Sequence, residues 1–178
     1  MLRPAKTDTT RYSKMKKRIV IKIGDVFAVP IARGWKRYFQ FISRDSHQLN
    51  SEVVRVFQAR YRKSENPELE NIVSDEVEFH IHLFIRLGVK KAAWSKIGKV
   101  SIGSDIELPY FRSSRDFGNP SIKISKNWYV WRVNDPKAKF VGELTSEFQN
   151  YDRGEIWPDE ALLEILNTGK SSWVYPGY

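Results

Sequence analysis

The hydrophobic and polar residues of this chain alternate with a period of two over several short segments. Successive side chains of a β-strand point to opposite faces, so this alternation predicts strands with one buried face. The clearest case is residues 77–85, where five apolar side chains take alternate positions. Similar patterns at 18–23, 26–31 and 38–43 predict three further strands. Arg33-Gly34 then forms the turn of a hairpin between the last two.

Other segments require a choice between patterns. Residues 53–61 fit both a strand and a helix face, and their β-branched valines favour the strand. Residues 128–133 are apolar on both faces, which predicts a central, buried strand. Residues 140–144 are its expected partner. The Gly-, Ser- and Pro-rich stretch at 98–121 predicts a long loop with one short strand at 106–111.

Helical signals are confined to two short segments. Asn66-Pro67 is typical of a helix start. Residues 158–168 form the clearest helix, which Gly169 ends. Consecutive hairpins without regular alternation of strands and helices argue against a doubly wound parallel sheet. The predicted fold is mostly β (α+β): a bent antiparallel sheet or a small SH3-like barrel, with two short helices packed outside.

Charge is distributed unevenly along the chain. The net charge is +9, and +7 of it lies in the first 22 residues, which hold eight Lys or Arg and one Asp. We therefore predict a basic, disordered arm over residues 1–17 and a single mostly β domain over 18–178. A basic arm can bind phosphate groups or an acidic surface, but a solvated tail is the simpler interpretation.

Composition excludes several kinds of chemistry. The chain has no cysteine, so it has no disulfide, thiolate zinc site or cysteine nucleophile. No stretch reaches the roughly 18 apolar residues of a membrane span, and the first residues lack the apolar segment of a signal peptide. These features predict a cytoplasmic protein that does not contact a membrane.

Candidate metal ligands occur on the strand at 77–85. Glu78, His80 and His82 occupy alternate positions, so two imidazoles and a carboxylate could face one cation. The polar face of a half-exposed strand explains the same residues more simply, and no cofactor is expected. The sequence also lacks a nucleophile elbow, a phosphate-binding glycine loop and a spaced pair of acids, so no enzymatic activity is predicted.

Aromatic and basic residues gather next to the first hairpin turn. Trp35, Arg37 and Tyr38 are residue types that dominate protein-binding surfaces, and we predict that they are exposed contacts for a protein partner. Two other interpretations stay open. The cluster could stack nucleic-acid bases, or its tryptophan could cover the edge of the core.

The segment Lys22–Ile31 reads K-I-G-D-V-F-A-V-P-I, and an aromatic strand at 38–42 follows it. This arrangement resembles the opening motif of the immunity protein 26 family, whose pattern is roughly K-x-G-D-[VI]-F-x-[VI]-P-[LI]. The resemblance covers mainly residues 22–61. It implies a small, mostly β, non-enzymatic protein that protects bacteria from a polymorphic toxin by occluding the working site of that partner.

The same motif allows a second hypothesis from a different class. G-D-V-F-x-V also resembles the first strand of SH3-like barrels, including ribonuclease toxins. A nucleic-acid-binding barrel would then use the basic arm as its phosphate contact. The basic net charge bears on the first hypothesis as well, because an inhibitor of a basic nuclease would be expected to be acidic.

Overall fold

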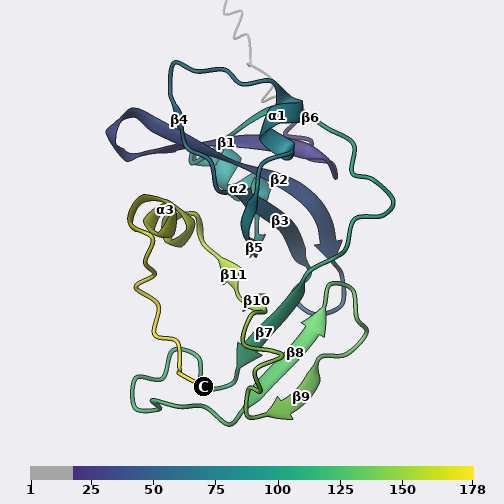
Figure 1. The fold of residues 1–178 in the computed structure, drawn as a ribbon, viewed down its shortest axis with the longest axis vertical. Helices are drawn as coiled ribbons and strands as arrows, with labels where there is room; N and C mark the ends of the chain where they lie inside the picture. Colours follow the sequence, from purple (N-terminus) through teal and green to yellow (C-terminus); the bar gives the residue numbers. More distant parts are fainter. Residues whose placement is uncertain (1–17) are drawn as a thin grey trace, which may run out of the picture.

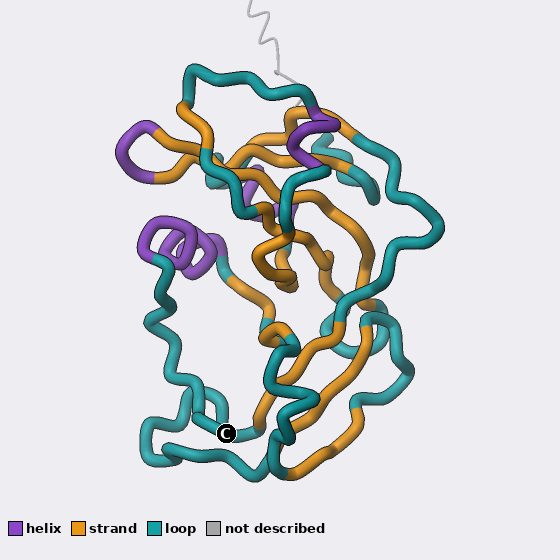
Figure 2. The backbone as a smooth tube through the Cα atoms, viewed as in Figure 1, coloured by secondary structure: helices purple, strands orange, loops and turns teal. Residues whose placement is uncertain are grey.

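The structure, a computed structural model, describes residues 18–178. Its strands form two sheets, and three short α-helices accompany them. In Figures 1 and 2 the larger sheet occupies the upper half of the view and the smaller sheet the lower right. The predicted mostly β class is confirmed, and the arm predicted over residues 1–17 lies outside the described residues.

The larger sheet has seven strands, in the order β11-β5-β3-β2-β1-β6 with β4 paired to β2 off this path. Its four longest strands pair antiparallel with their neighbours through β1-β2, β2-β3 and β3-β5. The strands are β1 (Asp25–Ile31), β2 (Trp35–Asp45), β3 (Ser51–Phe57), β4 (Tyr61–Arg62), β5 (Val77–Leu83), β6 (Ser95–Lys99) and β11 (Ile156–Trp157).

The first hairpin forms as predicted. A single 3-10 turn, η1 (Ala32–Gly34), joins β1 to β2, and both Arg33 and Gly34 take positive φ values, 58° and 75°. Pro30 has no N–H to donate to a neighbouring strand. Accordingly, β6 pairs with β1 only as far as Ala28, so Pro30 lies where one side of β1 has no neighbour.

The smaller sheet has four strands in the order β10-β7-β8-β9. They are β7 (Tyr110–Ser114), β8 (Trp128–Arg132), β9 (Lys139–Gly142) and β10 (Asp152–Arg153). The prediction of a central strand near residues 128–133 is confirmed, since β8 pairs with β7 on one side and β9 on the other. Its Trp128 and Trp131 are both buried.

Residues 18–178 contain three α-helices, where two were predicted. They are α1 (Leu69–Val73), α2 (Ile85–Lys90) and α3 (Asp159–Thr168). The prediction for α3 is confirmed, and Gly169 ends this helix in the left-handed conformation with φ 71°. Helix α2 was missed because the alternation at 77–85 runs without a break into its first residue, Ile85.

Three other details differ from the predictions. The barrel alternative is wrong, because the strands form two sheets and neither closes. The sheets are also mixed, because β11 pairs with β5 and β10 with β7 in parallel. Residues 18–23 form no strand, since the pairing of β1 with its neighbours begins only at Asp25 and leaves Val20 and Ile23 half-exposed.

Helices cover both faces of the larger sheet. On one face, Leu162 and Leu166 of α3 belong to the same buried cluster as Phe27, Phe39 and Trp94. Phe27 and Phe39 stack with ring centroids 5.0 Å apart, and Trp94 meets Phe39 edge-on at 5.4 Å. On the other face, Ile72 of α1 is buried in a separate cluster. Burial on both faces makes this sheet the main core of the protein.

A fully buried carboxylate lies where the two sheets meet. Asp45, at the end of β2, accepts hydrogen bonds at Oδ1 from the backbone N–H groups of His47 (3.2 Å) and Gln48 (3.1 Å). At Oδ2 it accepts a hydrogen bond of 3.1 Å from the indole Nε1 of Trp131, which belongs to β8 of the smaller sheet. One side chain therefore shapes the turn after β2 and joins the two sheets.

His82 of β5 completes this junction. Its imidazole is fully buried, with Nδ1 2.9 Å from Ser51 Oγ and Nε2 4.0 Å from Asp45 Oδ2. The ring also lies 4.3 Å from that of Phe111 in β7. Burial lowers the pKa of His82 to about 4, although the Asp45 carboxylate acts in the opposite direction. The imidazole is therefore neutral at pH 7.

Replacing Asp45 tests the junction. Asp45→Ala leaves buried donors without an acceptor, and we expect it to lower the free energy of unfolding by about 3 kcal/mol. This corresponds to a fall in Tm of roughly 6–12 °C, measured by thermal denaturation. Asp105→Ala, at an exposed position, is the control and is expected to change Tm little. Equal Tm values for the two variants would contradict the role given to Asp45.

Candidate functional site

The predicted contact residues Trp35, Arg37 and Tyr38 lie near the start of β2. The expectation that all three are exposed is wrong, because Arg37 and Tyr38 are each only 2% exposed. The reason is that β2 is an inner strand of the sheet, between β1 and β3. Trp35 is half-buried, with the Arg62 guanidinium 3.8 Å from its ring centroid. A role for Trp35 in partner binding stays a prediction.

The buried groups of this cluster support the sheet. Arg37 donates hydrogen bonds from Nε and Nη2 to the carbonyl oxygen of Phe57, and it forms an ion pair with Glu78. The ring of Tyr38 meets that of Tyr61 edge-on, 5.4 Å away. Burial raises the pKa of Tyr38, and the negative charge of Glu65 adds to this effect.

Glu78, His80 and His82 each have a different partner. Glu78 pairs with Arg37, the Nδ1 atom of His80 lies 3.0 Å from Asp152 Oδ2, and His82 contacts Ser51. Between residues 18 and 178, no three carboxylate or histidine side chains come together as ligands for one ion. The three residues therefore take part in separate polar contacts and do not form one cluster.

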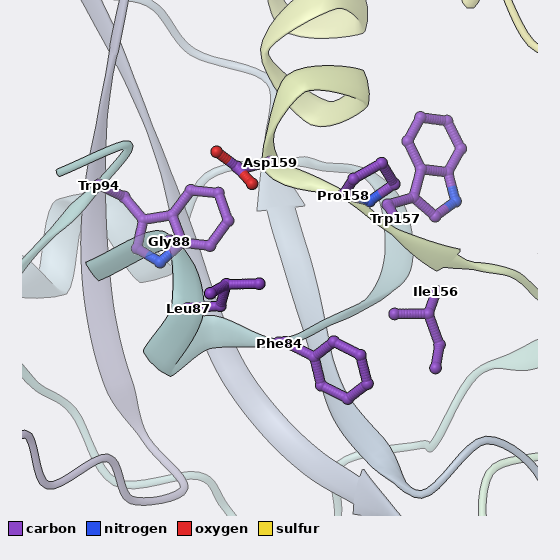
Figure 3. A pocket seen from close by; sticks show the side chains of 8 residues that line it. All are labelled: Phe84, Leu87, Gly88, Trp94, Ile156, Trp157, Pro158 and Asp159. Carbon is purple, nitrogen blue, oxygen red and sulfur yellow. The ribbon is translucent and has the colours of Figure 1, made fainter. Parts of the chain in front are cut away.

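An apolar groove opens between α2 and the start of α3, with a volume of about 250 Å³ (Figure 3). In this view Trp94, Leu87 and Phe84 lie on one side, and Ile156 and the Trp157-Pro158 pair on the other. Phe84 and Leu87 are 48% and 47% exposed, so two large apolar side chains face solvent at its edge. Neighbouring exposed apolar groups over a groove are typical of a binding surface.

The local sequence explains why the groove forms. A Cβ atom on Gly88 would lie 2.0 Å from the indole of Trp94, so only glycine lets α2 approach this ring. The Trp94 Nε1 donates a hydrogen bond of 2.9 Å to the carbonyl oxygen of Ile85, which fixes the indole under α2. The helix then presents Leu87 outward.

Charged groups border the groove unequally. Lys91 Nζ lies 2.6 Å from Asp159 Oδ1 and 3.0 Å from Glu160 Oε1, an arrangement that links α2 to the start of α3. Burial is the largest single effect and would raise the pKa of Asp159, but the hydrogen bonds to its carboxylate and the charge of Lys91 together outweigh burial, so the pKa is lowered. Arg86 and Lys90 are exposed on α2, and residues 84–95 contain no acid. The α2 side of the groove is therefore basic.

A second, polar cavity of about 300 Å³ lies between the two sheets. Next to the arginines that line it is Glu155, which is only 9% exposed. Its Oε1 accepts hydrogen bonds from Ser113 Oγ (2.7 Å) and the Tyr175 hydroxyl (3.2 Å). Burial raises the pKa of Glu155 to about 7, although these hydrogen bonds and the charges of Arg153 and Arg112 oppose the shift.

The fold and the groove define a mostly β protein with a surface suited to binding another molecule. The chain belongs to the immunity protein 26 family, because the model of that family matches residues 22–121, more than half of the chain. The match extends well beyond the motif-bearing residues 22–61 and includes β1 to β7, α1 and α2. Membership of this family supports a role in binding a toxin.

Other comparisons add no relative. The chain matches no curated protein and no solved structure. Within residues 18–178, no helix is long and apolar enough to cross a membrane.

Sequence reasoning missed the groove, although two of its signals are visible in the chain. Gly88 and Trp94 mark a close approach, but a glycine in a pattern does not reveal which ring it meets. Ile156 and Trp157 reach the site through β11, which pairs with a strand far away in the sequence. No local pattern predicts that pairing.

The titration of Glu155 makes stability depend on pH. Its pKa is about 7 in the folded protein and near its ordinary 4.5 in the unfolded chain, so its contribution is complete below pH 4.5 and is lost as the pH rises through 7. Glutamine stays neutral at every pH. As the pH rises from 5 to 8, we therefore expect the free energy of unfolding of Glu155→Gln to increase by on the order of 2–3 kcal/mol relative to that of the natural protein, measured by urea unfolding. The variant is compared with the natural protein at each pH, because the titration of His82 makes both proteins more stable as the pH rises and cancels in the difference. The exposed-site variant Glu147→Gln serves as control, and a pH-independent difference for Glu155→Gln would contradict the assignment.

The burial of Arg37 gives a second prediction. Arg37→Ala removes both donors to the Phe57 carbonyl group, and we expect a loss of about 2–3 kcal/mol in the free energy of unfolding. Arg60→Ala, at an exposed position of the same chain, should change it by less than about 0.5 kcal/mol. Chemical denaturation measures both values. Equal free energies of unfolding for the two variants would contradict the burial of Arg37.

Proposed function

We propose that this protein gives its bacterial host immunity to a toxin by binding the toxin in the cytoplasm and covering its working site. The observation that carries the proposal is the match to the immunity protein 26 family over residues 22–121. Protection by occlusion needs a contact surface and no chemical step. The groove beside α2 is the surface that the geometry supports best.

Phe84 and Leu87 make this groove a good contact. Both lie inside the segment that matches the family, and both expose about half of their surface in the free protein. If an apolar side chain of a partner entered the groove, both that side chain and these two residues would lose their contact with water, which favours binding. Such central, well-packed contacts supply most of the free energy of protein binding.

The charges around the groove indicate the chemistry of the toxin surface. Arg86 and Lys90 are exposed next to Leu87, whereas Lys91 is occupied by Asp159 and Glu160. The whole chain carries a net charge of +9. A partner with one protruding apolar side chain among acidic groups is complementary to this surface. The basic catalytic surface of a nuclease is not, so we propose a toxin whose contact surface is acidic.

The test begins with identification of the toxin. The tagged full-length chain is used to capture proteins from the native host's lysate, after nuclease treatment and at low and high salt. The captured protein is then identified and expressed in cells, once alone and once together with the chain. The proposal expects growth arrest by the captured protein alone and recovery on co-expression. A captured protein that leaves growth unchanged would contradict the immunity function.

The groove is then tested with variants. We expect Phe84→Ser combined with Leu87→Ser to weaken toxin binding at least about tenfold by calorimetry and to abolish protection. The matched control is Phe140→Ser, because Phe140 is 56% exposed and belongs to β9 of the other sheet. Full binding by the double variant at unchanged Tm would place the contact surface elsewhere.

A further inference from the structure

The polar cavity between the sheets has features that toxin binding does not use. It is lined by residues from β5, β7, β10, β11 and α3 and from the segment before β10, among them His80, Arg112, Tyr151, Asp152 and Arg153. His80 donates both its backbone N–H and, from Nδ1, its ring N–H to Asp152, at 3.0 Å each, so the charge of Asp152 is engaged by β5. The two arginines supply the remaining strong charges of the cavity wall.

The backbone fixes these arginines as a pair. Arg153 of β10 is the register partner of Arg112 of β7 in a parallel pairing, so the two side chains leave the sheet on the same face. Each guanidinium is held against a tyrosine ring of the C-terminal segment. Arg112 lies 4.7 Å from the ring centroid of Tyr178, and Arg153 lies 4.5 Å from that of Tyr175. Stacking of this kind orients a guanidinium and leaves its edge N–H groups free for an anion.

Several buried donors in this wall have no acceptor. Among the described residues, Arg112 Nε and Nη1 are shielded from solvent and make no hydrogen bond. Trp157 is 4% exposed and also lines the cavity, and its indole Nε1 likewise has no acceptor. In Figure 3 this indole extends away from Leu87 and Trp94, on the far side of the apolar groove. Buried donors without partners are rare in proteins, and a bound ion or water is the usual explanation.

We propose that the cavity binds a small tetrahedral oxyanion, inorganic phosphate or a phosphate monoester, through Arg112, Arg153 and the Trp157 indole. The N–H donors come from three strands, β7, β10 and β11, and they match the several acceptor oxygens of such a group, since one guanidinium alone can donate to two oxygens. A volume of about 300 Å³ is far larger than one water and falls at the lower end of small-ligand sites.

The neighbouring carboxylate does not cancel the positive charge. Glu155 accepts hydrogen bonds from Ser113 and Tyr175, whereas its Oε2 has no partner among the described residues. Because burial raises the pKa of Glu155 to about 7, roughly half of this carboxyl is neutral at that pH. The two guanidinium charges therefore outweigh the partial charge of Glu155 and the charge of Asp152 taken together, and the cavity attracts anions.

The experiment titrates inorganic phosphate into the full-length protein at constant ionic strength, with sodium chloride as the balancing salt, and follows Tm and the heat of binding. The expected result is a saturable rise in Tm with phosphate. We expect Arg112→Gln and Arg153→Gln each to weaken phosphate affinity at least about tenfold. The second variant keeps the test valid if the first fails to fold, because Arg153 lies in the two-residue strand at the sheet edge.

Arg115→Gln is the matched control. Arg115 follows β7, is exposed, and stacks 4.9 Å from the ring centroid of Tyr129, but it does not line this cavity. Its phosphate affinity should stay within twofold of that of the natural protein. A Tm that responds equally to phosphate and chloride would overturn the proposal. Equal losses in Arg115→Gln and Arg153→Gln would overturn it too, because binding would then follow net charge. Both readouts are independent of the toxin.

Discussion

The relation between the two sheets depends on the buried carboxylate of Asp45. A charged group without solvent is stable only when donors surround it, and Asp45 has the turn after β2 on one side and the Trp131 indole on the other. The neutral imidazole of His82 fills the adjoining space without a second charge. Because the Trp131 donor belongs to the smaller sheet, moving the sheets apart would leave Asp45 without this hydrogen bond. The inter-sheet cavity, which is lined from both sheets, depends on this arrangement.

The sequence predicts the parts of the fold that local chemistry determines. Alternation located β1, β2 and β5, β-branched valines located β3, and a run of residues that is apolar on both faces located β8. The proline and glycine around α3 marked both of its ends. Patterns of this kind carry no information about partners far away in the chain. The parallel pairings of β11 with β5 and of β10 with β7 were therefore missed, as was the separation into two sheets.

The same limit applies to the candidate site. Residue types singled out Trp35, Arg37 and Tyr38 as contacts, but type alone does not distinguish an exposed arginine from one that binds a carbonyl group inside a sheet. Arg37 is of the second kind because Phe57 and Glu78 meet it from neighbouring strands. Conversely, Phe84 and Leu87 look like core residues in the sequence, and only the position of α2 at the end of β5 exposes them.

The position of β11 has a consequence for how the chain folds as it is synthesised. The free side of β5 in the larger sheet is covered by Ile156 and Trp157, which leave the ribosome long after the family segment ends at residue 121. Until then, the backbone groups of β5 form an open edge, and the groove lacks the side that Ile156 and Trp157 supply. An open edge of this kind recruits strands from other chains, so the nascent protein depends on its last third for protection from aggregation. Long-range pairing of this kind also slows folding.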